Sequence, residues 1–365
     1  MVLPDLPLLL EQLNGREYIW LIIPTFATVA LLSRPFSGKI SDTVGRVFVM
    51  IFGAFITAFS GLLYIYIPFL SLFLILRGFH GLSAGFTPTG FTAYADDIVP
   101  LAKRGQAMGI IGVSNNIGNA LGWVIGSEFT KHFGLDWMFL FSSFLGLISM
   151  ILFATLKESI PNKAKFKLSV LKINKNELIE KKVLLPSLVF LLTAFSSGAI
   201  LALIADFSAY IHVENKGLYM AVYILASVFI RLMAGEWSDR YGRVKIVVIG
   251  CIVLFISMFI LAFSNEIVTY LISSVCFGIA FGLLSPSIFA WAVDLSLPGQ
   301  KGKAVGTLFV FMELGIIIGS SIGGLVYQNN TSNFITVFLI CASLALSPLF
   351  IISFFQSKQR NQSSL

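Results

Sequence analysis

Charged residues are scarce in this 365-residue chain: Asp, Glu, Lys and Arg make up 12% of it, whereas hydrophobic residues make up 57%. Soluble globular proteins contain about 25% charged residues, so too few remain here to build a water-exposed surface. Cysteine is also scarce, and three scattered residues in apolar segments form neither a disulfide scaffold nor a metal site. These shortages exclude a soluble enzyme, a disordered chain and a disulfide-rich domain, and they indicate a polytopic membrane protein.

Long apolar runs, by contrast, are abundant. A helix needs about 20 apolar residues to cross the hydrocarbon core, and the chain contains about eleven runs of that kind. A shorter piece, residues 1–13, precedes them and is too short to span. The sequence therefore predicts an all-α polytopic membrane protein. The predicted spans lie at about 17–37, 47–68, 70–92, 105–129, 135–156, 184–211, 217–236, 244–264, 267–291, 303–327 and 334–356.

Basic residues concentrate in alternate connections between these runs, whereas the other connections carry only Arg16, Lys131 and Lys216. Connections rich in Lys and Arg face the cytoplasm, which places the C-terminus and residues 157–183 inside. The net charge of +7 is then explained by topology, and nucleic acid is not an expected partner. We expect a multi-pass protein of a bacterial inner (plasma) membrane.

A lysine-rich polar stretch at 157–183 separates two apolar parts of the chain. We interpret it as a solvated cytoplasmic linker whose lysines lie favourably near anionic lipid; a regulatory binding segment is the alternative. The predicted domains are an N-terminal helical half at 1–156 with an incomplete first helix, the linker at 157–183, a C-terminal helical half at 184–356 and a cytoplasmic tail at 357–365.

An internal repeat relates the two halves with an offset of 197 residues. Residues 34–47 and 231–244 share seven identical positions in the pattern R-x-x-x-G-x-x-S-D-x-x-G-R-V, and the same offset relates Asp97 to Asp294. The offset contains an even number of predicted spans, so both halves have the same orientation. Two parallel six-helix repeats are therefore predicted.

Three motifs in this chain resemble those of the major facilitator superfamily. The loop pattern G-x-x-S-D-x-x-G-R occurs in both halves, and residues 77–84 (RGFHGLSA) are similar to the family's intramembrane motif R-x-x-Q-G-x-G-A. Glycines at 109, 118, 122 and 126 match the antiporter motif, with Trp123 and Ser127 in place of its proline and last glycine. The resemblance, strongest to drug:proton antiporter-type members, implies the major facilitator fold and secondary transport by alternating access.

The beginning of the chain departs from this pattern. The second half opens near Leu184, so the equivalent helix of the first half would begin before Met1. Residues 4–7 (PDLP) resemble the outer end of the family's first helix. We expect about eleven full transmembrane helices plus this outer end, explained either by a missed upstream start codon or by a shorter protein.

The repeated loops contain candidates for a cytoplasmic gate. Asp42 precedes Arg46 by four residues, and the second half repeats this spacing. The resemblance implies that such loops form salt bridges and helix-end contacts that hold the cytoplasmic side closed; charge that only sets the topology is the alternative. The predicted gate residues are Gly38, Asp42, Gly45, Arg46, Gly235, Asp239, Gly242, Arg243, Asp97 and Arg104.

A few ionisable residues fall inside predicted spans, where a charge costs about 2.5–3.5 kcal/mol or more. Glu313 lies mid-span, and burial favours the neutral form of a carboxyl group, so it is the candidate proton-coupling residue. Arg77 is a candidate for proton transfer or for holding an anionic group. The structural alternatives are a hydrogen-bonded acid and an arginine that extends to the interface. Further candidates for the coupling site or substrate cavity are Asn115, Asn116, Asn119, His80, Asp206 and Asp5.

Small residues at four-residue spacing allow helices to approach closely. Two such series occur at equivalent positions of the two halves, and they are the predicted helix-packing residues: Gly118, Gly122, Gly126, Gly315, Gly319 and Gly323.

These features predict a secondary transporter that is proton-coupled and exports small amphipathic compounds. Proton-coupled uptake of a sugar, organic acid or metabolite is one alternative, and a transport-inactive membrane sensor or scaffold is another. The expected partners are a small-molecule substrate, protons and the lipid bilayer, and the protein is expected to be a monomer. No nucleotide-binding loop, metal-ligand cluster or nucleophile–base pair is found in the hydrophilic segments, so neither an enzyme nor a cofactor is expected.

Overall fold

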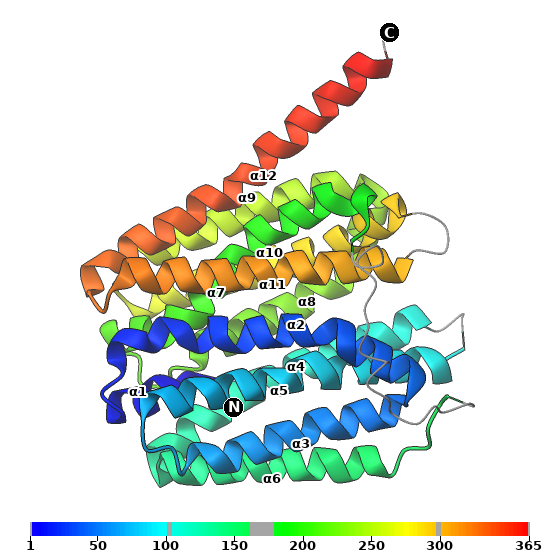
Figure 1. The fold of residues 1–365 in the computed structure, drawn as a ribbon. Helices are drawn as coiled ribbons and strands as arrows, with labels where there is room; N and C mark the ends of the chain where they lie inside the picture. Colours follow the sequence, from blue (N-terminus) through cyan, green and yellow to red (C-terminus); the bar gives the residue numbers. More distant parts are fainter. Residues whose placement is uncertain (1, 101–103, 161–178, 297–300, 364–365) are drawn as a thin grey trace. The chain divides into compact units, whose positions relative to one another are not determined.

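The computed structural model describes residues 2–100, 104–160, 179–296 and 301–363 (Figure 1). Side chains are described within these ranges except at positions 96, 104–109, 301–303 and 355–363. Most of the predicted linker at 157–183 and the side chains of the predicted tail at 357–365 lie outside the described residues. The chain divides into two compact units, Met1–Glu177 and Leu178–Leu365.

The first unit is helical throughout its described residues. Among the longer helices, α2 packs against α4, and α3 packs against both α4 and α6. Short 3-10 helices are labelled η. The elements in chain order are η1 (Leu3–Asp5), α1 (Leu6–Gln12), η2 (Arg16–Leu21), α2 (Ile22–Thr43), α3 (Arg46–Tyr64), α4 (Leu70–Ile98), α5 (Arg104–Phe133) and α6 (Leu135–Ala154).

The second unit has the same packing pattern, since α8 lies against α10, and α9 lies against both α10 and α12. The sequence repeat is therefore also a repeat of helix packing. The elements are η6 (Lys181–Val183), α7 (Leu184–Tyr210), α8 (Leu218–Tyr241), α9 (Arg243–Ala262), α10 (Ile267–Leu295), α11 (Lys301–Tyr327), η7 (Thr331–Asn333) and α12 (Phe334–Ser363).

Ten helices in the described ranges are long and apolar enough to cross a membrane. The sequence predicted about eleven spans, and the difference is α5. Its 30 residues rise about 45 Å, so it is long enough, but three asparagines near its middle lower its hydropathy. The fold is all-α and polytopic, as predicted.

The outward faces of the helices are apolar. On α3, Phe48, Phe55 and Phe59 are 40–46% exposed, whereas Val49 and Met50 on the opposite face are fully buried. A water-exposed surface rarely carries contiguous apolar area of this kind. The exposed aromatic face is therefore the face that contacts lipid.

Glycine permits a close helix contact at equivalent positions of the two units. A Cβ atom on Gly81 of α4 would collide with the carbonyl oxygen of Phe26 on α2. At the equivalent position of the second unit, a Cβ atom on Gly278 of α10 would collide with the carbonyl oxygen of Tyr223 on α8. Both helix pairs therefore require a residue without a side chain at this point.

The two units differ along α5 and α11. α11 packs extensively along α7, and Cβ atoms on Gly315 and Gly319 would strike the carbonyl oxygens of Leu191 and Phe195. Gly323 is less crowded, with Ala199 3.4 Å from such a Cβ atom.

Gly118, the equivalent of Gly315, differs from the predicted helix-packing role. Apart from the adjacent turns of α5 itself, no atom of the described residues lies within 4 Å of a Cβ atom placed there. The described elements that α5 contacts are η1, α4 and α6. Gly126 is buried and Gly122 is half-buried on the same helix.

Alanine at these two equivalent positions should therefore have opposite effects. Gly315→Ala places a methyl group against backbone atoms and should lower the free energy of unfolding by about 1–3 kcal/mol, as overpacking does. Gly118→Ala meets open space and gains about 0.5–1 kcal/mol of helix preference. Thermal unfolding of both purified variants measures the difference; equal shifts would contradict the asymmetric packing.

Candidate functional site

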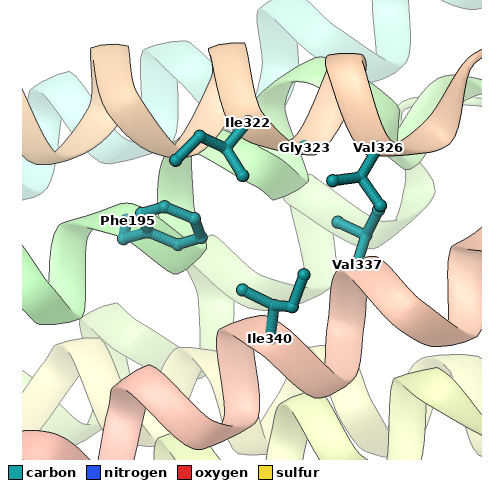
Figure 2. Close-up of a pocket in the computed structure, with 6 residues that line it drawn as sticks. All are labelled: Phe195, Ile322, Gly323, Val326, Val337 and Ile340. Atoms are coloured by element: carbon teal, nitrogen blue, oxygen red, sulfur yellow. The ribbon is translucent and has the colours of Figure 1, made fainter.

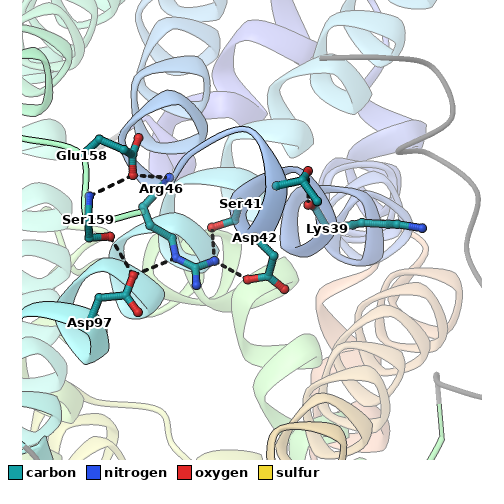
Figure 3. Close-up of polar contacts among 8 residues, drawn as sticks. Lys39, Ser41, Asp42, Arg46, Asp97, Glu158 and Ser159 are labelled. Carbon is teal, nitrogen blue, oxygen red and sulfur yellow. Dashed lines mark hydrogen bonds and ion pairs between the residues drawn. The ribbon is translucent and has the colours of Figure 1, made fainter. Parts of the chain in front are cut away.

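An arginine joins three helix ends in the first unit. Arg46, at the start of α3, forms ion pairs with Asp42 at the end of α2 and with Asp97 near the end of α4, the latter at Nε–Oδ2 3.1 Å (Figure 3). Its guanidinium also donates to the Ser41 hydroxyl at 3.2 Å. We call Ser41, Asp42, Arg46 and Asp97 the Arg46 cluster.

The second unit contains the same arrangement. Arg243, at the start of α9, pairs with Asp239 on α8 and with Asp294 on α10, the latter at 3.0 Å, and donates to Ser238 at 3.3 Å. We call these four residues the Arg243 cluster. Asp294 was not among the predicted gate residues, although the repeat offset from Asp97 identifies it.

Glycines make the turns that bring these charges together. Gly45 and Gly242 separate the paired helices with φ angles of 152° and 94°, a region that residues with a Cβ atom rarely adopt. Gly38 and Gly235 lie within α2 and α8, and a Cβ atom there would meet no described atom within 4 Å. Backbone conformation therefore requires glycine at two of the four predicted gate positions, Gly45 and Gly242. Arg104 begins α5, and its side chain lies outside the described residues.

Two residues after α6 extend the Arg46 cluster. The Glu158 carboxylate accepts hydrogen bonds from the backbone amides of Arg46 at 2.8 Å and Val47 at 3.3 Å. The Ser159 hydroxyl donates to Asp97 at 2.7 Å (Figure 3). Sequence reasoning missed both, because they lie more than 100 residues from Arg46 in the chain and outside the repeated loop.

The ion pairs of both clusters are partly exposed. The Arg46 side chain is 15% exposed and that of Arg243 25%, while Asp42 and Asp239 are 68% and 67% exposed. Exposed pairs of this kind contribute about 0–1 kcal/mol each. The helix ends are therefore held by contacts that separate at low energetic cost.

Arg77 is buried on α4, with 3% of its surface exposed. Its Nε donates to the carbonyl oxygen of Ile22 at 3.0 Å, and its guanidinium carbon lies 4.2 Å from the centroid of the Phe26 ring. In the second unit, the Ser274 hydroxyl donates to the equivalent carbonyl oxygen of Tyr219 at 2.5 Å. One hydrogen bond of Arg77 is thus structural, whereas its charge has no counterpart in the repeat.

His80 lies one turn further along α4 and is also buried. Its Nδ1 is 3.4 Å from the Tyr64 hydroxyl, and its ring packs edge-on against Phe26 with centroids 5.5 Å apart. The structure thus brings the predicted residues Arg77 and His80 together around one aromatic ring.

Glu313 is buried near the middle of α11, with 6% of its surface exposed. Its repeat equivalent Asn116 is half-buried on α5, whereas the neighbouring Asn115 and Asn119 are exposed and their side chains are joined by a hydrogen bond of 2.8 Å. The first unit therefore presents a polar asparagine surface where the second unit buries a carboxyl group.

Asp5 and Asp206 occupy the beginnings of the two units in different ways. Asp5 is 2% exposed and accepts a hydrogen bond from the Thr130 hydroxyl of α5 at 3.1 Å. Asp206 lies near the end of α7 and is half-buried. Asp5 therefore ties the short N-terminal segment to α5.

A narrow, partly open gap between α7, α11 and α12 is lined entirely by apolar residues (Figure 2). It offers no polar group to a substrate, and we interpret it as a small packing defect between the three helices. The lining residues are Phe195, Ile322, Gly323, Val326, Val337 and Ile340. In the part of the chain that the structure describes, no group of three His, Cys, Asp or Glu side chains is placed to hold a metal ion.

A comparison with models of protein families identifies the family to which the chain belongs. The model described as Major Facilitator Superfamily matches residues 1–217 and 187–364. The chain belongs to the major facilitator superfamily. It is accordingly a transporter and not an enzyme, and its helices make it a multi-pass integral protein of the inner membrane.

Among members of this superfamily, the chain is 25% identical over 343 residues to Multidrug resistance protein 2 of Bacillus subtilis, covering 90% of this chain and 85% of the relative. It is 23% identical to the Quinolone resistance protein NorA of Staphylococcus aureus, covering 90% and 86%. The solved structure of the nucleoside transporter NupG matches with a TM-score of 0.79 at 14% identity, covering 97% of this chain and 95% of that one.

The clusters lead to a prediction for transport kinetics. Asp42→Asn and Asp239→Asn each remove one exposed ion pair, so the free energy of unfolding should change by no more than about 1 kcal/mol. If the clusters act as the predicted cytoplasmic gate, turnover should fall several-fold while substrate binding is retained. Initial transport rates and equilibrium dye binding in proteoliposomes separate the two effects.

Arg16→Gln is the matched control, because Arg16 is 61% exposed and forms an ion pair with Glu11 outside both clusters. Turnover of Asp42→Asn and Asp239→Asn equal to that of this control would rule out a gating role.

Proposed function

We propose that this transporter exports small amphipathic compounds in exchange for protons by alternating access. The observation that carries the proposal is the buried Glu313 on α11, an ionisable group inside a membrane-spanning helix. Such groups are rare in spans because of their cost, and they mark ion or proton pathways. Glu313 would bind a proton in one conformation and release it in another that admits water.

The direction of transport is supported by the relatives. Those named above are a multidrug resistance protein and a quinolone resistance protein. The glycine spacing of the antiporter motif in α5 agrees with export. We infer that the substrate of this chain is a compound of the same general kind, apolar enough to enter from the bilayer.

The Arg46 and Arg243 clusters are proposed as latches on the cytoplasmic side. The positive-inside rule supports this orientation, which also places the linker at 157–183 and the tail at 357–365 in the cytoplasm. Helical halves at 1–156 and 184–356 would move as separate bodies in a monomer. Because the latch pairs are exposed, protonation at Glu313 needs to shift the balance between conformations by only a few kcal/mol.

Proton-coupled uptake is the second candidate. Trp123 stands where the antiporter motif has proline, and it is buried within the first unit. This substitution weakens the match to the antiporter motif. Arg77, Asn115, Asn116, Asn119, His80 and Glu313 would serve either direction.

Replacement of Glu313 by glutamine tests proton coupling. Glu313→Gln keeps the size of the side chain but cannot release a proton, so it should abolish compound-driven proton movement while folding is retained. Everted membrane vesicles with an imposed pH gradient provide the assay, with a panel of lipophilic cationic dyes as probes. Wild-type protein should dissipate the gradient on dye addition.

Glu128→Gln is the matched control, because the Glu128 side chain is 44% exposed near the end of α5. It should behave as wild type. Proton movement driven by the Glu313→Gln variant, or no response from the wild type to any dye, would refute proton coupling through Glu313.

Serine at position 77 separates the two roles of Arg77. Ser274 shows that serine supplies the equivalent backbone hydrogen bond in the second unit, so Arg77→Ser should be more stable than Arg77→Ala. Arg77→Ala leaves the Ile22 carbonyl without this donor and should lose about 1–3 kcal/mol. Both variants lack the buried charge and should transport at least about ten-fold more slowly, equivalent to about 1.4 kcal/mol. Full transport by Arg77→Ser would restrict Arg77 to a structural role.

A further inference from the structure

The N-terminus of α3 is capped by a carboxylate, whereas no carboxylate among the described residues caps the N-terminus of α9. In the first unit, α6 ends at Ala154, and the chain turns so that Glu158 accepts hydrogen bonds from the first two amides of α3. A Cβ atom on Gly45 would strike this carboxylate. Glu158 therefore neutralises the positive end of the α3 dipole.

In the second unit, α12 continues as a helix to Ser363 instead of turning back (Figure 1). Among the described residues, no side chain accepts a hydrogen bond from the amides of Arg243 or Val244. A Cβ atom on Gly242 would meet no described atom within 4 Å. No atom of the described residues therefore takes the place that the Glu158 carboxylate has in the first unit.

This space is part of a cavity of about 920 Å³ between the α8–α9 turn and α12. Its polar end is formed by residues 241–245, and Ser353 of α12 also lines it, with its hydroxyl donating to the carbonyl oxygen of Phe350 at 3.0 Å. Its apolar wall is formed by Val248, Ile249, Trp291, Leu349 and Ile352. The cavity thus combines a basic, hydrogen-bonding end with a hydrocarbon wall.

Lys245 provides the charge that distinguishes this end. It is exposed at the cavity and forms no ion pair with any described residue. Arg243, by contrast, is held by Asp239 and Asp294. An anion entering the cavity would therefore meet a lysine and two helix-terminal amides that have no partner among the described side chains.

We propose that this cavity binds an anionic phospholipid of the inner leaflet. The phosphate group takes the place that the Glu158 carboxylate has in the first unit, next to Lys245 and the amides of Arg243 and Val244. The acyl chains follow the apolar wall toward the lipid-facing side of α9, where Ile252 and Phe259 are 40% and 46% exposed. Basic pockets between helices on the cytoplasmic side are suited to such headgroups.

The apolar wall is the reason to prefer a lipid to a free phosphate ion, because hydrocarbon contributes nothing to the binding of an inorganic anion. The inference relies on the proposed orientation only in naming the inner leaflet. Its test measures lipid binding and not transport. The lipid proposal can therefore fail while the proposed function stands, and the proposed function can fail while lipid binding is observed.

Native mass spectrometry of the full purified chain in detergent provides the test. The protein is titrated with phosphatidylglycerol, with phosphatidylcholine of the same acyl chains, and with inorganic phosphate. Wild-type protein should retain phosphatidylglycerol in preference to phosphatidylcholine. Lys245→Ala should weaken phosphatidylglycerol binding about five-fold, the effect of one lysine near an anionic lipid, and leave phosphatidylcholine unchanged.

Ser353→Glu places a carboxylate inside the cavity and should weaken phosphatidylglycerol binding at least as much, whereas Ser353→Gln, of the same size without the charge, should not. Lys216→Ala, in the loop before α8, is the control for loss of a cation elsewhere in the unit. Equal retention of the two lipids by wild type, full displacement of phosphatidylglycerol by inorganic phosphate, or unchanged binding in both Lys245→Ala and Ser353→Glu would each overturn the proposal.

Discussion

Moving a charged side chain to the centre of a bilayer costs about 2.5–3.5 kcal/mol even on the lowest scales, and this cost arranges the polar groups of both units. Most charges lie at helix ends, where Arg46 and Arg243 each join three helices. The exceptions are few and are enclosed by protein: Arg77 lies against a backbone carbonyl and an aromatic ring, and Glu313 is buried on α11. Because lipid penalises an uncompensated charge, each exception requires either a compensating contact or a function.

The duplication of the chain separates these two explanations. Where both units make the same contact with different side chains, the contact belongs to the fold: the hydrogen bond of Arg77 to Ile22 is replaced by that of Ser274 to Tyr219. Polar groups without a counterpart at the equivalent position are specific to one unit. The guanidinium charge of Arg77 and the carboxyl group of Glu313 both remain, since their equivalents are serine and asparagine. The shared fold therefore does not explain why these two ionisable groups lie inside membrane-spanning helices.

The helices, the repeat and the Asp–Arg pairs could be predicted from the sequence, because hydrophobic run length and a spacing of four residues are local properties of the chain. Other features depend on distant segments. Glu158 reaches Arg46 only because the chain turns after Ala154, and no local pattern encodes that turn. Gly118 shares the spacing of Gly315 but not its contact, since packing requires a partner helix that the glycine itself does not specify. A motif therefore identifies the residue, while its energetic role is set by what the rest of the unit brings against it.

The same reasoning shows why the two clusters are not energetically equivalent. Both contain an arginine between two aspartates, and each exposed pair is weak. In the first unit, however, Ser159 also holds Asp97, and Glu158 holds the helix that carries Arg46. These hydrogen bonds to charged groups add to the exposed ion pairs of the first cluster. The Arg243 cluster has no such support among the described residues and lies beside an open cavity. The strength of the second cluster therefore depends on what occupies that cavity, whereas the first is stabilised by its own chain.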